Sequence, residues 1–273
     1  MRRRRLLQAG LALAGGSWAA ARAALPTAQP AVPQPAPLRR GSRIAALAPS
    51  TWLDPRVDAL FYVGAGWGSA RVLEAGWRFP ASPRWCVGFS DCSALLLAQW
   101  AAGSVGGVHG WFGRDAGAWQ RLVALLQHQP VAPLQGASVQ GGIARGPLVV
   151  SNLTIATSLI GTPWLPPLKG AILVLEDTGE APYRIDRQLT QWRSSGLLEG
   201  VAGIGLGRFS WAEDDVLPGD FSMEEILLER LAPLGVPLVR HLPVGHGRPN
   251  LALPIGRLAE LDGRSGQLRL LSA

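Results

Sequence analysis

Ser90 lies where a side-chain hydroxyl could act as a nucleophile. The run Arg84–Asp91 reads RWCVGFSD, and an apolar helical pattern starts directly after it. A strand that ends in a sharp turn and continues into a helix raises one side chain above the sheet edge. Backbone N–H groups at the start of that helix then face whatever the side chain attacks. The pattern therefore makes Ser90 a candidate catalytic nucleophile.

A serine hydroxyl needs a base at neutral pH, and the usual base is a histidine oriented by a carboxylate. The chain has four histidines. His246, held between two glycines beyond an apolar stretch, is the best candidate. His109 lies in a glycine-rich turn and could line a site. His128 ends a helical pattern, which favours a surface position, and His241 has no special setting.

Glu176 is the best candidate for the carboxylate that orients the histidine. It comes directly after 170–175, a continuously apolar run that predicts a strand buried on both faces. Open α/β sheets gather their sites at the carboxyl ends of the strands. The alternative is an acid in a solvated loop, with no role in chemistry.

A glycine-rich turn at 64–68 imitates a dinucleotide-binding fingerprint. The third small position of that fingerprint is Ser69, and the stretch about 20 residues further on carries no ribose-binding acid. A turn of this kind near Ser90 could instead donate an N–H to an oxyanion hole. No Cys/His grouping has metal-ligand spacing, so we expect neither a cofactor nor a metal.

The elements that must position these residues alternate between short apolar runs and helical patterns, which predicts an α/β protein. Strands are expected at 42–48, 59–63, 170–175, near 201–206, in the run before Ser90 and in the apolar stretch 236–239. Helices are expected at 69–75, after Ser90, and at 116–127, 154–160, 185–192 and 223–231. The composition changes near 142–146, which we take as a domain boundary.

Residues 1–23 have the form of an export signal. Four arginines precede a short apolar core at 6–14, and Ala21–Ala23 offers a small-x-small cleavage site. The arginine and leucine order resembles a twin-arginine signal, with a plain Sec signal or an uncleaved anchor as alternatives. The apolar core is shorter than the roughly 20 residues that span a bilayer. We expect export, into the periplasm, without a lasting membrane anchor, followed by a Pro/Ala linker at 24–37.

Charge and cysteine content exclude further classes of protein. The formal charge of +7 includes five arginines in the first 23 residues, which hold no acids, so the mature chain carries about +2. The other basic residues are scattered, and nucleic acid is not an expected partner. Cys86 and Cys92 bracket Ser90, and because one is expected in a strand and the other in a helix, we expect no disulfide.

Together these segments resemble the LD-carboxypeptidase family, serine peptidases that include murein tetrapeptide carboxypeptidases and microcin C immunity proteins. The resemblance covers most of the chain from Ala59 onward. The matching segments are Gly88–Asp91, Asn152–Leu153, Ser158–Trp164, Leu175–Asp177, Glu180–Arg187, Gly245–Gly247 and Leu253–Pro254.

The resemblance implies two α/β domains and an exported serine carboxypeptidase. The N-terminal domain, 38–145, would be Rossmann-like and carry the nucleophile elbow; the C-terminal domain, 146–273, would hold a mixed sheet. The bond cleaved would be the one before the terminal D-alanine of a murein tetrapeptide. The implied site residues are the triad Ser90, Glu176 and His246, the oxyanion-hole residues Gly66 and Asp91, and the substrate contacts Trp67 and Asn152.

The chain departs from the family pattern in two places. Gly64 and Ala65 stand where an arginine and a glycine are usual. In the family, several tens of residues lie between the segments that match Pro49–Ser50 and Asp58–Ala59. This chain has only Thr51–Val57 between them, so its N-terminal domain is expected to be shorter by roughly one βαβ unit. A muropeptide-binding paralogue with impaired catalysis and a microcin-type amidase are therefore alternatives. A homodimer that completes the site also stays open.

Overall fold

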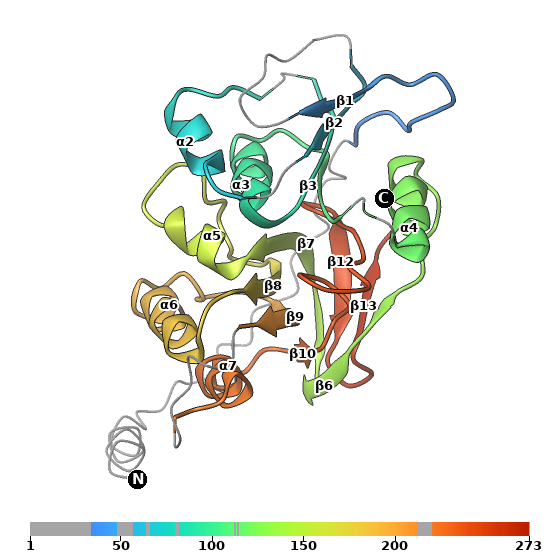
Figure 1. The fold of residues 1–273 in the computed structure, drawn as a ribbon. Helices are drawn as coiled ribbons and strands as arrows, with labels where there is room; N and C mark the ends of the chain where they lie inside the picture. The colour runs from blue at the N-terminus through green and yellow to red at the C-terminus, as the bar shows by residue number, and fades with distance from the viewer. Residues whose placement is uncertain are drawn as a thin grey trace.

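The computed structural model describes residues 34–47, 57–63, 66–79, 82–111, 113, 115–211 and 220–272. The predicted export signal and most of the predicted linker lie outside these ranges. The described chain forms two β-sheets with helices packed on their faces (Figure 1). This is the mixed α/β architecture expected from the sequence.

The first sheet carries the nucleophile. Its strand order is β1-β2-β3-β4-β11. The first four strands are parallel, and β11 runs antiparallel to β4. The strands are β1 (Ile44–Leu47), β2 (Ala59–Tyr62), β3 (Trp85–Gly88), β4 (Gly107–His109) and β11 (Leu253–Pro254).

Helices cover both faces of this sheet, which is why β3 is apolar at every position. Alternate residues of β3 point to opposite faces. Cys86 joins the core on the side of α3 (Ser93–Ala101), whose three successive leucines are fully buried. Trp85 and Val87 pack on the other side against α4 (Ala116–Leu126), which stands apart from the remaining helices in Figure 1.

The second sheet carries the predicted acid. Its strand order is β5-β13-β12-β7-β8-β9-β10-β6, with β7 to β10 parallel and the other pairs antiparallel, so it is the expected mixed sheet. The strands are β5 (Leu134–Gln135), β6 (Ala137–Gln140), β7 (Ile143–Asn152), β8 (Ile172–Thr178), β9 (Gly203–Ser210), β10 (Leu238–Arg240), β12 (Leu258–Asp262) and β13 (Gln267–Leu270).

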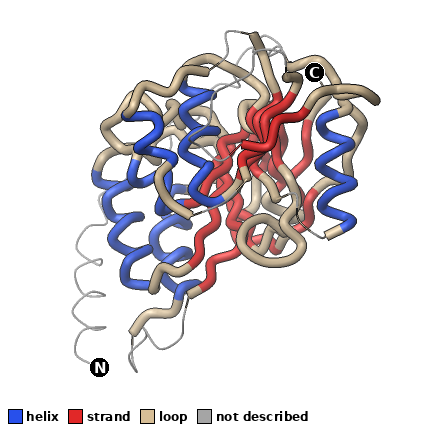
Figure 2. Tube along the Cα trace, turned by 45° about the horizontal axis from the view of Figure 1, so that its top comes forward, coloured by secondary structure: helices blue, strands red, loops and turns tan. Residues whose placement is uncertain are grey.

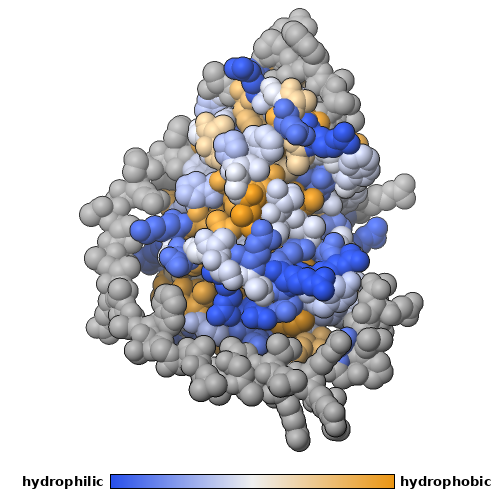
Figure 3. Space-filling view, turned by 90° about the vertical axis from the view of Figure 1, so that its left-hand side faces the viewer, coloured by the Kyte–Doolittle hydropathy of each residue, from blue (hydrophilic) through white to orange (hydrophobic). Residues whose placement is uncertain are grey.

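The helices of the second half gather on one side of the strands (Figure 2). They are α5 (Leu153–Ser158), α6 (Pro182–Ser194) and α7 (Met223–Leu231). Each turns an apolar stripe inward; on α6 the buried stripe includes Ile185, Leu189 and Trp192. Figure 3 looks onto this side, where broad hydrophilic areas alternate with smaller apolar ones. Within the described ranges, no helix is long and apolar enough to cross a membrane.

The two sheets exchange strands across residue 145. β5 and β6 precede it yet belong to the second sheet, and β11 follows it yet completes the first. The end of the predicted linker also contacts the fold: Pro35 is buried, and the indole N–H of Trp85 donates to the carbonyl of Ala36 at 2.9 Å. The domain limits at 38, 145 and 146 stay predictions.

The far end of the second sheet buries a charged group that the sequence analysis did not single out. Glu260 on β12 is nearly buried and accepts from Arg145 on β7 at 2.7 Å and from Arg269 on β13 at 2.6 Å. Each arginine lies directly opposite Glu260 in the strand register. The pairing of a buried carboxylate with two guanidinium groups offsets the cost of removing it from water.

Candidate active site

Ser90 is the first residue of the 3₁₀ turn η1 (Ser90–Cys92), which follows β3 after Phe89. Its φ is +59°, a left-handed conformation that costs a non-glycine residue about 1–2 kcal/mol. Gly88 makes the turn possible, because a Cβ at that position would lie 3.0 Å from both the Cys92 Cβ and the Tyr62 ring. This strand–turn–helix geometry is the one predicted for a nucleophile elbow. Both cysteines beside it are buried and free.

The structure brings Ser90, His246 and Glu176 into one hydrogen-bonded chain. The His246 Nε2 lies 3.1 Å from the Ser90 Oγ, and its Nδ1 lies 2.8 Å from the Glu176 Oε2. An ionised carboxylate only accepts, so Nδ1 is the donor, and the unprotonated Nε2 of a neutral ring accepts from the serine hydroxyl. The backbone N–H of His246 also donates to Oε2, at 3.1 Å.

Glu176 lies within a strand rather than after one, which corrects the expectation from the sequence. β8 continues through the two acids to Thr178, because Asp177 and Thr178 still pair with β9. The register shifts at Glu176, where Gly207 and Arg208 of β9 oppose this single residue. The shift resembles a β-bulge, a feature that re-aims a side chain near a sheet edge. The side chain of Glu176 is fully buried.

Glycines let the His246 loop approach Glu176 closely. A Cβ on Gly245, whose φ is +105°, would lie 2.7 Å from the Glu176 Cβ and 2.8 Å from its Oε2. A Cβ on Gly207 would lie 2.5 Å from the carbonyl oxygen of Val244. Neither position has room for a side chain. The glycine before His246 is thus explained by packing against the acid.

Arg208 holds the other end of the His246 loop. Its guanidinium donates to the carbonyl oxygens of Arg248 at 2.8 Å and Pro249 at 3.0 Å. Gly247, with φ +141°, lies against that guanidinium and leaves no room for a Cβ. The loop is therefore fixed on both sides of His246. Sequence reasoning missed Arg208, since an arginine near the end of a strand gives no distinctive signal.

His109 and Phe89 pack around the triad from the first sheet. The Phe89 ring lies 4.4 Å from the His246 ring and 5.3 Å from the His109 ring, measured between centroids. His109 is fully buried, with its Nε2 4.0 Å from the Glu176 Oε1. Burial lowers the pKa of His109 to about 4, so its ring is neutral at physiological pH. The sequence left His109 open as a residue that could line a site, and the structure puts it against the triad acid.

Asp91 anchors the glycine-rich turn beside Ser90. Its buried carboxylate accepts from the backbone N–H of Ser69 at 2.8 Å, at the start of α2 (Ser69–Glu74). This bond fixes the end of the turn that contains Gly66 relative to the nucleophile. No contact of Gly66 or of the Asp91 N–H tests the oxyanion-hole assignments, which stay predictions.

The two predicted substrate contacts have different surroundings. Trp67 is 80 % exposed, with the guanidinium of Arg71 5.6 Å from its ring centroid. Asn152 is buried beside Glu176 in the strand register, and its Oδ1 accepts from the Ile155 N–H at 3.0 Å. Asn152 therefore caps helix α5. A role in substrate binding is a prediction for both residues.

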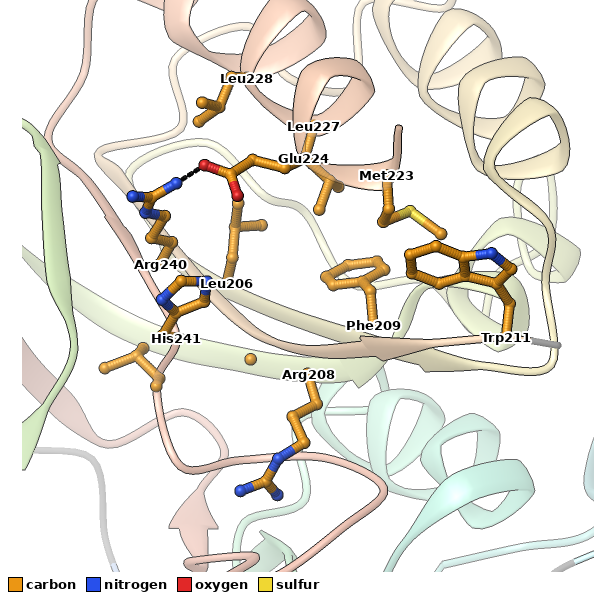
Figure 4. Close-up of a pocket in the computed structure, with 12 residues that line it drawn as sticks. Leu206, Arg208, Phe209, Trp211, Met223, Glu224, Leu227, Leu228, Arg240 and His241 are labelled. Atoms are coloured by element: carbon orange, nitrogen blue, oxygen red, sulfur yellow. Dashed lines mark ion pairs between the residues drawn. The ribbon is translucent and has the colours of Figure 1, made fainter. Parts of the chain in front are cut away.

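The described chain contains two hollows of different size, and the smaller one adjoins the His246 loop. A recess of about 70 Å³ is lined by Trp111, Asp115, Gly247, Arg248 and Asn250 among others. A larger cavity of about 380 Å³ lies between α7 and strands β9 and β10 (Figure 4). Its walls include Phe209, Trp211 and Met223, and an ion pair joins Arg240 to Glu224 beside it. The small recess adjoins the triad loop directly.

The fold and this site define a serine-nucleophile centre at the junction of two α/β sheets. The Ser–His–Glu chain can activate the serine and hold the histidine in the required tautomer. Within the ranges that the structure describes, no three His, Cys, Asp or Glu side chains are grouped to hold a metal ion.

Comparison with known proteins identifies the family. Residues 39–110 match the LD-carboxypeptidase N-terminal domain and residues 145–261 match the LD-carboxypeptidase C-terminal domain. The chain belongs to the LD-carboxypeptidase family.

Individual relatives agree with this assignment. A Synechocystis sp. protein, slr1534, provisionally named a carboxypeptidase, is 47% identical over 81% of this chain and 75% of its own length. The murein tetrapeptide carboxypeptidase of Pseudomonas aeruginosa is 34% identical over 77% of this chain and 74% of its own.

Solved structures share the fold at lower identity. The muramoyltetrapeptide carboxypeptidase of Oxalobacter formigenes matches 80% of this chain and 78% of its own, with a TM-score of 0.66 and 24% identity. The microcin C7 self immunity protein MccF in its wild-type apo state matches 81% of this chain and 77% of its own, with a TM-score of 0.70 and 18% identity.

Proposed function

We propose that this protein is an exported serine carboxypeptidase that removes the terminal D-alanine from murein tetrapeptides. The observation that carries the proposal is the hydrogen-bonded chain from Ser90 through His246 to the buried Glu176, at a nucleophile with φ +59°. The names of the murein peptide carboxypeptidase relatives support the substrate class.

The reaction follows from the positions of the three side chains. The Ser90 Oγ attacks the carbonyl carbon of the scissile amide while its proton moves to the His246 Nε2. His246 then gives that proton to the leaving amine, the C–N bond breaks, and D-alanine departs. Water then attacks the acyl-enzyme while the same nitrogen takes up one of its protons. The ester bond to Ser90 breaks, the shortened peptide leaves with a new carboxyl group, and His246 returns the proton to the Ser90 Oγ. Glu176 stabilises the imidazolium at each stage, and the N–H groups of Asp91 and Gly66 are assigned to the oxyanion.

An exopeptidase must also recognise the free carboxylate of its substrate. Arg248 is exposed, lines the recess beside the triad loop, and follows His246 by two residues. Arginine binds carboxylates in a two-pronged geometry, and no ion pair joins Arg248 to another described residue. We assign Arg248 to the terminal carboxylate of the substrate, with Trp67 and Asn152 as further contacts.

The test is D-alanine release from a murein tetrapeptide by the purified mature chain, beside Ser90→Ala. Release by the wild type and none by the variant is the expected result. A well-folded wild type that binds the tetrapeptide without releasing D-alanine would instead identify a muropeptide-binding paralogue. Hydrolysis of an aminoacyl-sulfamoyl adenosine in place of the tetrapeptide would point to a microcin-type amidase.

Export is tested separately. We propose a twin-arginine route for residues 1–23, and cell fractionation of the full chain beside the Arg3→Lys, Arg4→Lys double variant checks it. The wild type is expected outside the cytoplasm and the double variant inside it. Equal export of both proteins would favour a Sec route.

A further inference from the structure

One oxygen of the Glu176 carboxylate, Oε1, receives no hydrogen bond from Ser90 or His246. Oε2 accepts both N–H groups of His246, whereas no donor among the described residues lies within hydrogen-bond distance of Oε1. Glu176 is fully buried, and a buried carboxylate oxygen without a donor is costly. The Nε2 of His109 lies 4.0 Å from Oε1.

His109 is also unsatisfied: neither of its ring nitrogens has a hydrogen-bond partner in the described part of the chain. Its place is well fixed, since β4 pairs with β3 on one side and with β11 on the other. The Phe89 ring packs against its edge. Two unsatisfied groups of complementary kind thus face each other about 1 Å beyond hydrogen-bond distance.

We propose that His109 is a positioning residue whose neutral Nε2–H donates to the Glu176 Oε1 and holds the plane of the carboxylate, so that Oε2 stays directed at His246. Small torsional changes in the two side chains bring the atoms together, and catalytic hydrogen bonds commonly tighten when substrate is bound. This inference rests on the proposed triad. It extends the triad by one residue, on the side of the acid away from His246.

The charged and titratable neighbours of Glu176 are few. His246 faces it from the loop after β10, His109 faces it from β4, and Asp177 follows it on β8. Burial raises the pKa of Asp177 to about 6, and that carboxylate accepts from the Thr154 N–H at 2.8 Å. Above about pH 6 Asp177 is ionised and only accepts hydrogen bonds, so of these groups His246 and His109 are the ones that can donate to Glu176.

Two substitutions of His109 distinguish the loss of a hydrogen-bond donor from a change in packing. The amide nitrogen of Gln reaches about as far as the Nε2 of histidine, whereas that of Asn reaches only about as far as its Nδ1. His109→Gln therefore keeps the donor and His109→Asn removes it, with a polar amide in both. His109→Phe removes the donor while keeping a planar ring, and His128→Asn is the control for loss of an exposed histidine.

The readout is the rate at which a fluorophosphonate labels Ser90 in the mature chain, measured from pH 5 to 9. Labelling forms an O–P bond and expels fluoride, so it reports activation of the serine without depending on the murein substrate. His109→Asn and His109→Phe are expected to label about 10–100-fold more slowly, the effect of one hydrogen bond to a charged group. In both variants the fall in labelling rate on the acid side of the pH profile should shift to higher pH by about 0.5–1 unit. Without the donor to Glu176, the His246–Glu176 pair takes up a proton more readily.

His109→Gln and His128→Asn are expected to keep the wild-type rate and pH profile. Wild-type labelling and an unchanged acid limb in His109→Asn, or equal losses in the Gln and Asn variants, would overturn the proposal and leave a packing role. If His109→Phe does not fold, as judged by thermal melting, the Gln and Asn pair still decides. Labelling that persists in Ser90→Ala would refute the triad itself, which is a distinct failure.

Discussion

Gly245→Ala should damage catalysis more than its cost in backbone strain suggests. At φ +105° any L side chain is strained, by about 1–2 kcal/mol. The added methyl would also lie 2.7 Å from the Glu176 Cβ, so the acid and the His246 loop must separate by about 1 Å to reach ordinary contact. Overpacking of this kind costs about 1–3 kcal/mol more.

A matched control exists in Gly235→Ala, at φ +74° with nothing within 4 Å of the added Cβ. Strain alone should lower its melting temperature by roughly 2–8 °C, against roughly 4–20 °C for Gly245→Ala. A misplacement of 1 Å in a catalytic group costs about 100-fold in rate, so only Gly245→Ala should lose about 100-fold in kcat for D-alanine release. If both variants keep kcat within about 3-fold of each other, the close approach at Gly245 does not position the triad.

Further variants test the anchors around the site. Asp91→Ala removes the acceptor for the Ser69 N–H. It should lower the free energy of unfolding, measured with urea, by about 1–3 kcal/mol, and it should also lower kcat. Unchanged kcat would show that the glycine-rich turn holds its place without this bond. Arg248→Gln should raise KM for the tetrapeptide with little change in kcat, and an unaltered KM would exclude Arg248 as the carboxylate ligand. The pKa of His109 is about 4 in the folded chain against an ordinary value of 6.5, so the unfolded chain binds the proton first and stability is lost as pH falls from 6.5 toward 4. Relative to His109→Gln, the wild type should lose up to about 3 kcal/mol over that window, and a difference in unfolding free energy that does not vary with pH would contradict the burial argument. Glu260→Ala leaves two guanidinium groups that are more than half exposed, so no buried charge stays unpaired; it should lower the free energy of unfolding by only about 1 kcal/mol with kcat unchanged, and a loss of kcat in a folded variant would mean that this pairing also shapes the site.

The hydrogen-bonded arrangement of Ser90, His246 and Glu176 could be predicted from the sequence because each of the three residues stands beside a strong local signal. Gly88 and the apolar residues around it indicate the turn at Ser90, and the glycines around His246 mark a loop with unusual backbone demands. Glu176 was found through the apolar strand before it, although that strand continues past it. Apolarity signals burial, and it cannot show where strand pairing ends when the paired residues are acids.

Five strands of the second sheet, β5, β6, β7, β12 and β13, were not predicted from the sequence, for a related reason. β7 has Arg145, Gly146 and Pro147 in its first half, and this change in composition predicts a boundary between domains rather than a strand. In the structure Gly146 is a close contact, since a Cβ there would lie 2.0 Å from the Gly170 carbonyl oxygen. β12 carries a buried charge, Glu260, which is compensated by two arginines from the neighbouring strands β7 and β13. Pairing of this kind is set by tertiary structure and leaves no local pattern.

Because β11 comes late in the sequence, the first sheet can be completed only late in synthesis of the chain. β11 pairs with β4, and His109 of β4 lies opposite Leu253. At ribosomal speeds of about 5–20 residues per second, Leu253 is added roughly 7–30 s after His109, and until then this side of β4 has no partner strand. His246 emerges only just before it, so Ser90 is made long before its base and the nascent chain has no means of activating it. In the proposed mechanism, Ser90 therefore becomes reactive only after synthesis has passed His246.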